Sequence, residues 1–229
     1  MSETEPLKST EPFCFYTRLN LSELTGRKAR NLKDLVTYLK SASEAVIYYH
    51  THHYLQEHHY LSPEPPNDFA YWVKAALNEN ELSEKLSSIN TIEFSNLNDL
   101  RNNIVETIEK HIAKTKDKLR DANEGQELYF LKSVSFILPT RYQASSLEEF
   151  VTKLEKVTIE SLYFHMFDTR IYHARGGNDF SLWLEHSLGE TELAKQIARL
   201  DPYTYTLESL RTKIIMLVRE RLKKVAHPV

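Results

Sequence analysis

The sequence predicts a mainly α fold, in which two pseudo-symmetric multi-helix repeats form one compact unit with a minor two-stranded β element. Three observations predict it: apolar residues recur at helical spacing, two long segments of the chain match each other, and turn-forming residues are few. The 229 residues include only 5 glycines and 8 prolines, which argues against a turn-rich β fold. The apolar fraction of 41% is typical of a chain that folds around a core.

The match between the two halves is clearest around two histidines. When residues 31–55 are set against residues 146–171, His50 falls on His165 at a steady offset of 115. Farther along the chain, NDFAYWVKAAL meets NDFSLWLEHSL with five identities in 11 positions. We infer an internal duplication from this match. The organisation that follows is a mobile N-terminal tail, a first helical repeat and a second helical repeat, at residues 1–11, 12–122 and 123–229.

Each repeat is expected to consist of a strand followed by a run of helices. The segments PFCFYTRLNL (12–21) and ELYFLKSVSFIL (127–138) are rich in aromatic and β-branched residues, which favours one strand in each. Capping residues and apolar spacing then mark where helices begin. The predicted starts are Asn31, Ser43, Asn67, Glu79 and Leu97 in the first repeat, and Ser146, Thr158, Asn178, Glu190 and Thr206 in the second.

Composition and charge narrow the classes of function. The net charge of −3 gives no basic surplus for binding phosphate backbones, so we expect no nucleic-acid partner. The longest aliphatic run is IIMLV, far shorter than a membrane span, so we expect no membrane partner. The polar start MSETEPLKSTEP and the lone Cys14 indicate a cytoplasmic protein without disulfides. A homo-oligomer remains compatible with all of this.

Five of the ten histidines lie in IYYHTHHYLQEHHY, residues 47–60. On a regular helical wheel His50 and His53 share one face, and His165 and Asp168 share the equivalent face in the second repeat. Imidazole and carboxylate groups are the usual ligands of zinc, iron and manganese. If the two helices face each other, these four side chains are a candidate metal site. The alternative is that they are hydrogen-bonded structural residues, which is the commoner use of a histidine on a mixed helical face.

The tripeptide Asn-Asp-Phe occurs twice, at residues 67–69 and 178–180. Asparagine is a favoured N-cap, and aspartate in a first turn complements the helix dipole, so the motif predicts helix starts. A second hypothesis is that Asp68 and Asp179 accept hydrogen bonds from nearby histidines and fix their tautomers. Arg170 is a candidate for holding an anionic group through its planar guanidinium.

The stretches YYHTHHYL, SPEPPNDFAYWV, NDFSLWL and GETELAKQIARLDPYTYTLESLR resemble a family of prokaryotic proteins that is catalogued as a domain of unknown function. The resemblance covers nearly the whole chain apart from the N-terminal tail. It implies membership of that family and brings no activity, substrate or catalytic residue.

We therefore expect a non-catalytic binding or regulatory protein that holds a small polar or anionic molecule in a cleft between the repeats. The predicted ligand-binding residues are His50, His165, Asp168 and Arg170, supported by Asp68 and Asp179. One alternative is a metal-dependent hydrolase that uses the His/Asp cluster to activate water. Another is a structural or protein-interaction module. The sequence identifies no cofactor and does not decide whether the protein is an enzyme.

Overall fold

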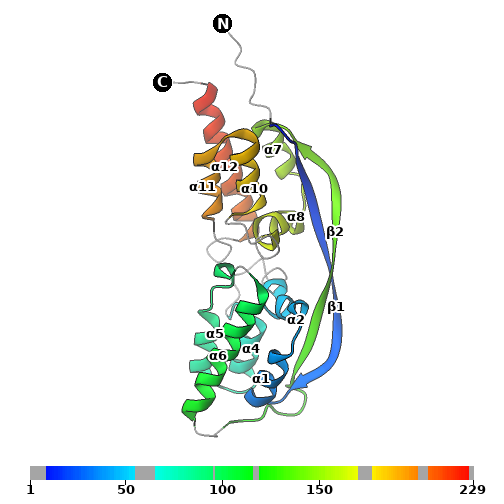
Figure 1. Cartoon of the computed structure of the whole chain (residues 1–229), viewed down its shortest axis with the longest axis vertical. Helices are drawn as coiled ribbons and strands as arrows, with labels where there is room; N and C mark the ends of the chain where they lie inside the picture. Colours follow the sequence, from blue (N-terminus) through cyan, green and yellow to red (C-terminus); the bar gives the residue numbers. More distant parts are fainter. Residues whose placement is uncertain are drawn as a thin grey trace. The chain divides into compact units, whose positions relative to one another are not determined.

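The computed structural model describes residues 9–54, 65–94, 96–115, 119–169, 177–200 and 206–226. Within these residues the chain is mainly helical and contains one sheet of two long strands (Figure 1). It divides into two compact units. Unit 1 comprises Met1–Leu19 and Phe136–Val229, and unit 2 comprises Asn20–Ser135.

The two strands are β1 (Phe13–Ala29) and β2 (Leu128–Ala144), each 17 residues long. They run antiparallel, because side chain to backbone bonds join Thr25 to Phe130 at one end and Thr140 to Phe15 at the other. The boundary between the units crosses both strands, so each unit contains one part of β1 and one part of β2. Buried and exposed residues alternate poorly in the middle of the pair, where both strands carry runs of exposed residues.

The predicted fold class is wrong in one respect. Two pseudo-symmetric repeats were expected to form one compact unit, whereas the chain forms two compact units that share its strands. The mainly helical composition with a two-stranded β element is present. Both strands are longer than predicted. Residues 22–28 of β1, SELTGRK, are mostly polar and exposed, and such residues give no strand-like alternation from which the extension could be predicted.

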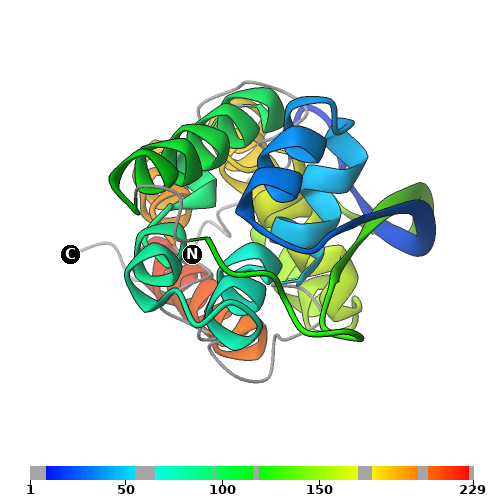
Figure 2. The same cartoon turned by 90° about the horizontal axis from the view of Figure 1, so that it is seen from below.

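Unit 2 contains a set of helices that pack on one another. Their bounds are α1 (Leu32–Lys40), α2 (Glu44–Tyr48), the π-helix η1 (Tyr49–His53), α4 (Asp68–Ala75), α5 (Asn80–Ser87), the 3₁₀ turn η2 (Thr91–Glu93) and α6 (Leu97–Thr115). The long helix α6, in green, contacts the blue helices α1 and α2, and α4 packs along α5 (Figure 2).

Unit 1 is built from a similar series. Its helices are α7 (Leu147–Leu154), α8 (Ile159–Tyr163), the π-helix η3 (Phe164–Asp168), α10 (Asp179–Leu188), α11 (Thr191–Ala198) and α12 (Leu207–Ala226). The helix α10 packs along α11, and α12 contacts α7 and α8. None of the helices in the described parts of the chain has the length and apolar character needed to cross a bilayer.

The predicted helix starts are confirmed because the capping chemistry is local. Asn31, Ser146 and Thr158 each accept a hydrogen bond from a first-turn amide through the side chain. Asn67 and Asn178 do the same at α4 and α10, and each also uses its amide group. The Asn67 amide donates to the Leu86 carbonyl, and the Asn178 amide donates to the Ile197 carbonyl. Each asparagine therefore ties the start of one helix to the end of the next.

Aromatic side chains from the strands and helices fill the core of unit 1. Phe15 stacks on Phe150 with ring centroids 5.8 Å apart, and Phe150 stacks on Trp183 at 5.4 Å. Phe13 and Phe180 complete the cluster through edge and tilted contacts. Burial of rings of this size supplies much of the apolar stabilisation of a small domain.

Substitution of Asn178 by serine tests the double role of this cap. Serine keeps an oxygen for the Ser181 amide but removes the side-chain donor to the buried Ile197 carbonyl, which still accepts from the backbone N–H of Leu200. Because one hydrogen bond between the two helices is lost, we expect the free energy of unfolding, measured by urea denaturation, to fall by about 0.5–1.5 kcal/mol.

The matched control is Asn31→Ser. A serine oxygen can also replace the Asn31 oxygen that accepts from the Asp34 amide. The side-chain amide of Asn31 donates to Asp121 at an exposed position, so its loss is small. This variant should lose less than about 0.5 kcal/mol. Equal losses in the two variants would contradict the double role.

Candidate functional site

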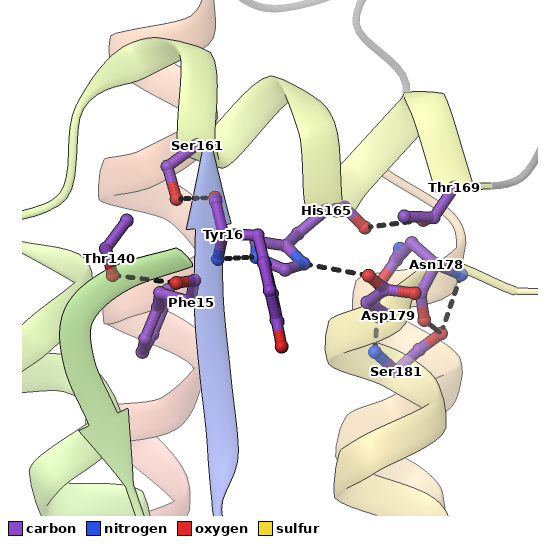
Figure 3. A network of polar contacts seen from close by, with 9 residues as sticks. All are labelled: Phe15, Tyr16, Thr140, Ser161, His165, Thr169, Asn178, Asp179 and Ser181. Carbon is purple, nitrogen blue, oxygen red and sulfur yellow. Dashed lines mark hydrogen bonds and ion pairs between the residues drawn. The ribbon is translucent and has the colours of Figure 1, made fainter. Parts of the chain in front are cut away.

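His165 connects the outer edge of β1 to the helices of unit 1 (Figure 3). It lies on η3 with only 2% of its side chain exposed. Its Nδ1 is 2.8 Å from Oδ2 of Asp179, the first residue of α10. The backbone N–H of Tyr16 donates to its Nε2 at 2.8 Å. The ring therefore joins a strand amide to the carboxylate at a helix start.

These contacts determine the tautomer of His165. A backbone amide can only donate, so Nε2 must carry a lone pair, and the ring proton lies on Nδ1, where it is donated to Asp179. The ring is thus neutral. Burial lowers the pKa of His165 below its ordinary value of 6.5, although the Asp179 carboxylate acts in the opposite direction. Protonation of Nε2 would break the bond from Tyr16.

Unit 2 contains the same arrangement around His50. Its Nδ1 is 2.8 Å from Oδ2 of Asp68, and the backbone N–H of Leu131 donates to its Nε2 at 3.1 Å. Leu131 follows Tyr16 by 115 residues, the same offset that separates His165 from His50. His165 therefore accepts a hydrogen bond from β1 within unit 1, and His50 accepts one from β2 within unit 2.

The carbonyl of Tyr16 also has a hydrogen-bond partner on a helix. The Ser161 hydroxyl of α8 donates to the Tyr16 carbonyl at 2.6 Å, next to the bond between the Tyr16 amide and His165. Unpaired peptide groups on an edge strand invite pairing with other chains. Here α8 and η3 use side chains to complete this part of the edge.

Both histidines lie in π-helical turns, which the sequence analysis did not anticipate. The segments are η1 (Tyr49–His53) and η3 (Phe164–Asp168). A π-turn has a wider hydrogen-bond spacing than an α-turn and is frequent at functional sites. Its smaller rotation per residue invalidates a wheel drawn for a regular helix. This is why the expected shared face of His50 with His53, and of His165 with Asp168, does not describe their contacts.

Asp168 and His53 have their own contacts. Arg18 on β1 forms an ion pair with Asp168 at 3.1 Å, and both side chains are buried, with 5% and 0% exposed. The ring of His53 lies against Tyr49, with centroids 5.1 Å apart. Arg170 lies outside the described residues. Arg18 was missed by the sequence analysis, because an arginine in an apparent edge strand gives no sign of a buried partner.

The predicted metal site is not assembled in the described parts of the chain, where no group of three or more His, Cys, Asp or Glu side chains is placed to hold a metal ion. The ring nitrogens explain part of this result. Both nitrogens of His50 and both of His165 already bind a carboxylate and a strand amide. A metal would have to displace one of these partners.

A cavity of about 460 Å³ lies in unit 2, and neither His50 nor His165 lines it. One wall is a face of α6, which contributes Lys110, His111 and Lys114. The other wall comes from the end of α5 and the segment 88–94 that follows it. The volume is within the range of small-molecule sites. The cavity could not be predicted from the sequence, because lysines on a helix are most often solvated.

The cavity also contains one buried histidine. Nε2 of His111 is 3.2 Å from Oε2 of Glu79, the residue that precedes α5. The side chain of His111 is 4% exposed. This contact joins α6 to the start of α5 and so fixes the spacing of the two helices that flank the cavity.

Most of the chain is similar to a known protein family and to one solved structure. It matches the model of a family of unknown function, DUF5752, over residues 10–219. The chain belongs to this family. A solved structure of OrfY from Thermoproteus tenax is similar to it at 30% sequence identity, with a TM-score of 0.79. The similarity covers 93% of this chain and 96% of OrfY. No curated protein matches the chain. The family description gives no activity that could be transferred.

Replacement of His165 by alanine should remove the hydrogen bond that joins β1 at Tyr16 to η3. The variant leaves the Tyr16 amide and the Asp179 carboxylate without their shared partner, so we expect a loss of about 2–4 kcal/mol in the free energy of unfolding. Hydrogen exchange at the Tyr16 amide, followed by NMR, should accelerate strongly.

The control for this variant is His186→Ala. His186 is an exposed residue of α10 and should cost less than about 0.5 kcal/mol. Unchanged exchange at Tyr16 in a folded His165→Ala protein would show that the ring does not hold the strand.

The lowered pKa of His165 predicts a dependence of stability on pH. The unfolded chain takes up a proton on this ring below about pH 6.5, whereas the folded chain does so only at lower pH. The contribution to stability is therefore fully present above pH 6.5 and is lost as the pH falls toward the folded-state pKa. Urea denaturation between about pH 5 and pH 8 should show this loss in the wild type and a smaller loss in His165→Gln. An identical slope in both proteins would contradict the assignment.

Proposed function

We propose that this is a cytoplasmic, non-catalytic binding or regulatory protein for a small anionic molecule, held in the cavity beside α6. The single observation that carries the proposal is the cavity itself, whose lining contains Lys85, Lys110 and Lys114 and one carboxylate, Glu93. Among the lining side chains, three ammonium groups and one carboxylate favour an anion, while Glu81 and Glu106 pair with two of the lysines from outside the lining. In this proposal His50 and His165 stabilise the fold and do not contact the ligand.

The lysines differ in how they are engaged. Lys85 pairs with Glu81 and Lys110 pairs with Glu106, each one turn away on the same helix. Such exposed pairs are weak and can exchange partners at little cost. Lys114 forms no direct ion pair in the parts of the chain that the structure describes, and the Glu81 carboxylate, which is bonded to Lys85, acts on Lys114 only at longer range. We therefore assign Lys114 as the main contact of the anion, assisted by Lys110.

Comparison of the matching segments of sequence supports a site that is specific to unit 2. At the offset of 110 that relates α6 to α12, Lys224 stands where α6 has Lys114, but Glu220 stands where it has Lys110. The pair of lysines one turn apart therefore occurs in α6 and becomes a pair of opposite charges in α12. We infer from this difference that the lysine pair of α6 has no equivalent at the matching positions of α12.

The histidine contacts support the non-catalytic part of the proposal. A general base needs a free lone pair and a pKa near the working pH. The lone pair of His165 is used by the Tyr16 amide, and burial lowers the pKa of His165. Using this ring for proton transfer would release the strand.

Thermal unfolding in the presence of inorganic phosphate tests the proposal. At constant ionic strength, tens of millimolar phosphate should raise the Tm of the full chain saturably, by about 2–4 °C. The double variant Lys110→Gln/Lys114→Gln should fold normally, because it removes only surface charges, and should lose this response. The control Lys195→Gln, in an exposed pair with Glu192 on α11, should keep it.

A second candidate is a protein-interaction module, and the exposed apolar side chains favour it. Eight of the ten large apolar side chains that are exposed among the described residues lie on β1 and β2, including Leu19, Leu21, Phe136 and Leu138. Patches of this kind often mark interfaces. If phosphate left the Tm unchanged, or stabilised the double lysine variant equally, the anion-binding proposal would fail and this second role would take its place.

A further inference from the structure

We infer that the ligand of the α6 cavity carries an apolar group as well as an anionic group, as an aryl or acyl phosphate or carboxylate does. This inference rests on the proposed function and specifies the class of ligand. It comes from the composition of the two walls. The α6 wall carries two of the three cations, Lys110 and Lys114. The third, Lys85, lies near the end of α5, and the segment 88–94 that follows it contributes the two large apolar side chains of the lining, Ile89 and Phe94.

The α6 wall presents a single polar face. Asn103, Thr107, Lys110, His111 and Lys114 follow one another along the helix, mostly at intervals of three and four residues. Residues at this spacing lie on the same side of a helix. The anionic group is expected at the end of this face where Lys110 and Lys114 lie one turn apart.

Within the opposite wall, the segment 88–94 disfavours an anion and accommodates an apolar group. Glu93 belongs to this wall, and its carboxylate accepts a hydrogen bond from the Asn90 amide at 3.0 Å. A second negative charge beside Glu93 would be unfavourable. Ile89 and Phe94 are each only half-buried, so an apolar group placed against them would remove further surface from water. Charge and burial together orient the ligand, with its anion toward α6 and its apolar part toward Phe94.

The two requirements can be separated with two simple probes. Methyl phosphate and phenyl phosphate have the same anionic group, and only the second has a ring. In isothermal titration with the full chain, we expect phenyl phosphate to bind about tenfold more tightly than methyl phosphate. Phe94→Ala should reduce the affinity for phenyl phosphate at least about fivefold and leave that for methyl phosphate unchanged.

Matched variants complete the experiment. Tyr71→Ala removes an exposed aromatic ring of the same unit that does not line the cavity, and should leave both affinities unchanged. Ile89→Ala provides a second apolar variant if Phe94→Ala fails to fold. Lys114→Gln should weaken both probes by a similar factor.

The outcomes separate the two claims. If methyl phosphate binds in a lysine-dependent manner and phenyl phosphate binds no better, the inference about the apolar group is overturned and the proposed function stands. Equal weakening of both probes by the apolar variants would also overturn the inference. If neither phosphate binds the wild-type chain, the proposed function fails as well.

Discussion

A hydrogen bond from a strand amide to a neutral imidazole is the interaction on which each unit depends. A two-stranded sheet has two open edges, and a pair of strands alone is marginally stable in water. At Tyr16 and at Leu131 the open edge is tied to the helices by a histidine that accepts the amide proton. The acceptor role requires that the ring proton lie on the other nitrogen. Asp179 and Asp68 hold it there, and they do so from the first turn of a helix, where the helix dipole favours their negative charge.

The π-turns follow from the same requirement. All five residues of η3 are buried, and four of the five residues of η1 are buried, so these turns are enclosed by protein. A segment in that position must present side chains to the strand and to the neighbouring helices at once. Arg18 adds a charged contact in unit 1, where its ion pair with Asp168 joins β1 to the end of η3. An ion pair that is buried on both sides gives little net stability, but it penalises any displacement of the strand that would separate the charges.

Much of the helical framework could be predicted from the sequence, because its signals are local. A cap such as Asn178 acts within its own first turn, so its effect can be recognised without tertiary information. The pairing of an aspartate from each Asn-Asp-Phe motif with a histidine could be stated as a hypothesis, because aspartate and histidine recur together in both halves. The division into two units could not be predicted. The boundary falls in the middle of both strands, after Leu19 and after Ser135, where burial follows no regular alternation that could mark it.

The partners of the predicted site residues were missed for a different physical reason. A helical wheel assumes the rotation per residue of an α-helix. The π-turns that contain His50 and His165 have a smaller rotation, so the wheel misplaces the side chains of the predicted metal site. Arg18 had the opposite problem, because burial of a charged residue is determined by its partner, and Asp168 lies 150 positions away in the chain. The cavity lysines are ordinary in sequence, since i,i+4 pairs with glutamate are typical of a solvated helix.

These constraints separate the parts of the chain that hold the fold from those that are free to bind. The buried histidines are committed, because any new partner must compete with a carboxylate and an amide that are already in place. Lys110 and Lys114 of α6 are not committed in this way, since exposed side chains exchange ion-pair partners with solvent and with other ions at small cost. An anion that approaches Lys114 breaks no contact on which a helix or a strand depends. In the proposed function, recognition therefore takes place on α6, where the sequence carries no motif, while His50, His165 and their aspartates maintain the fold.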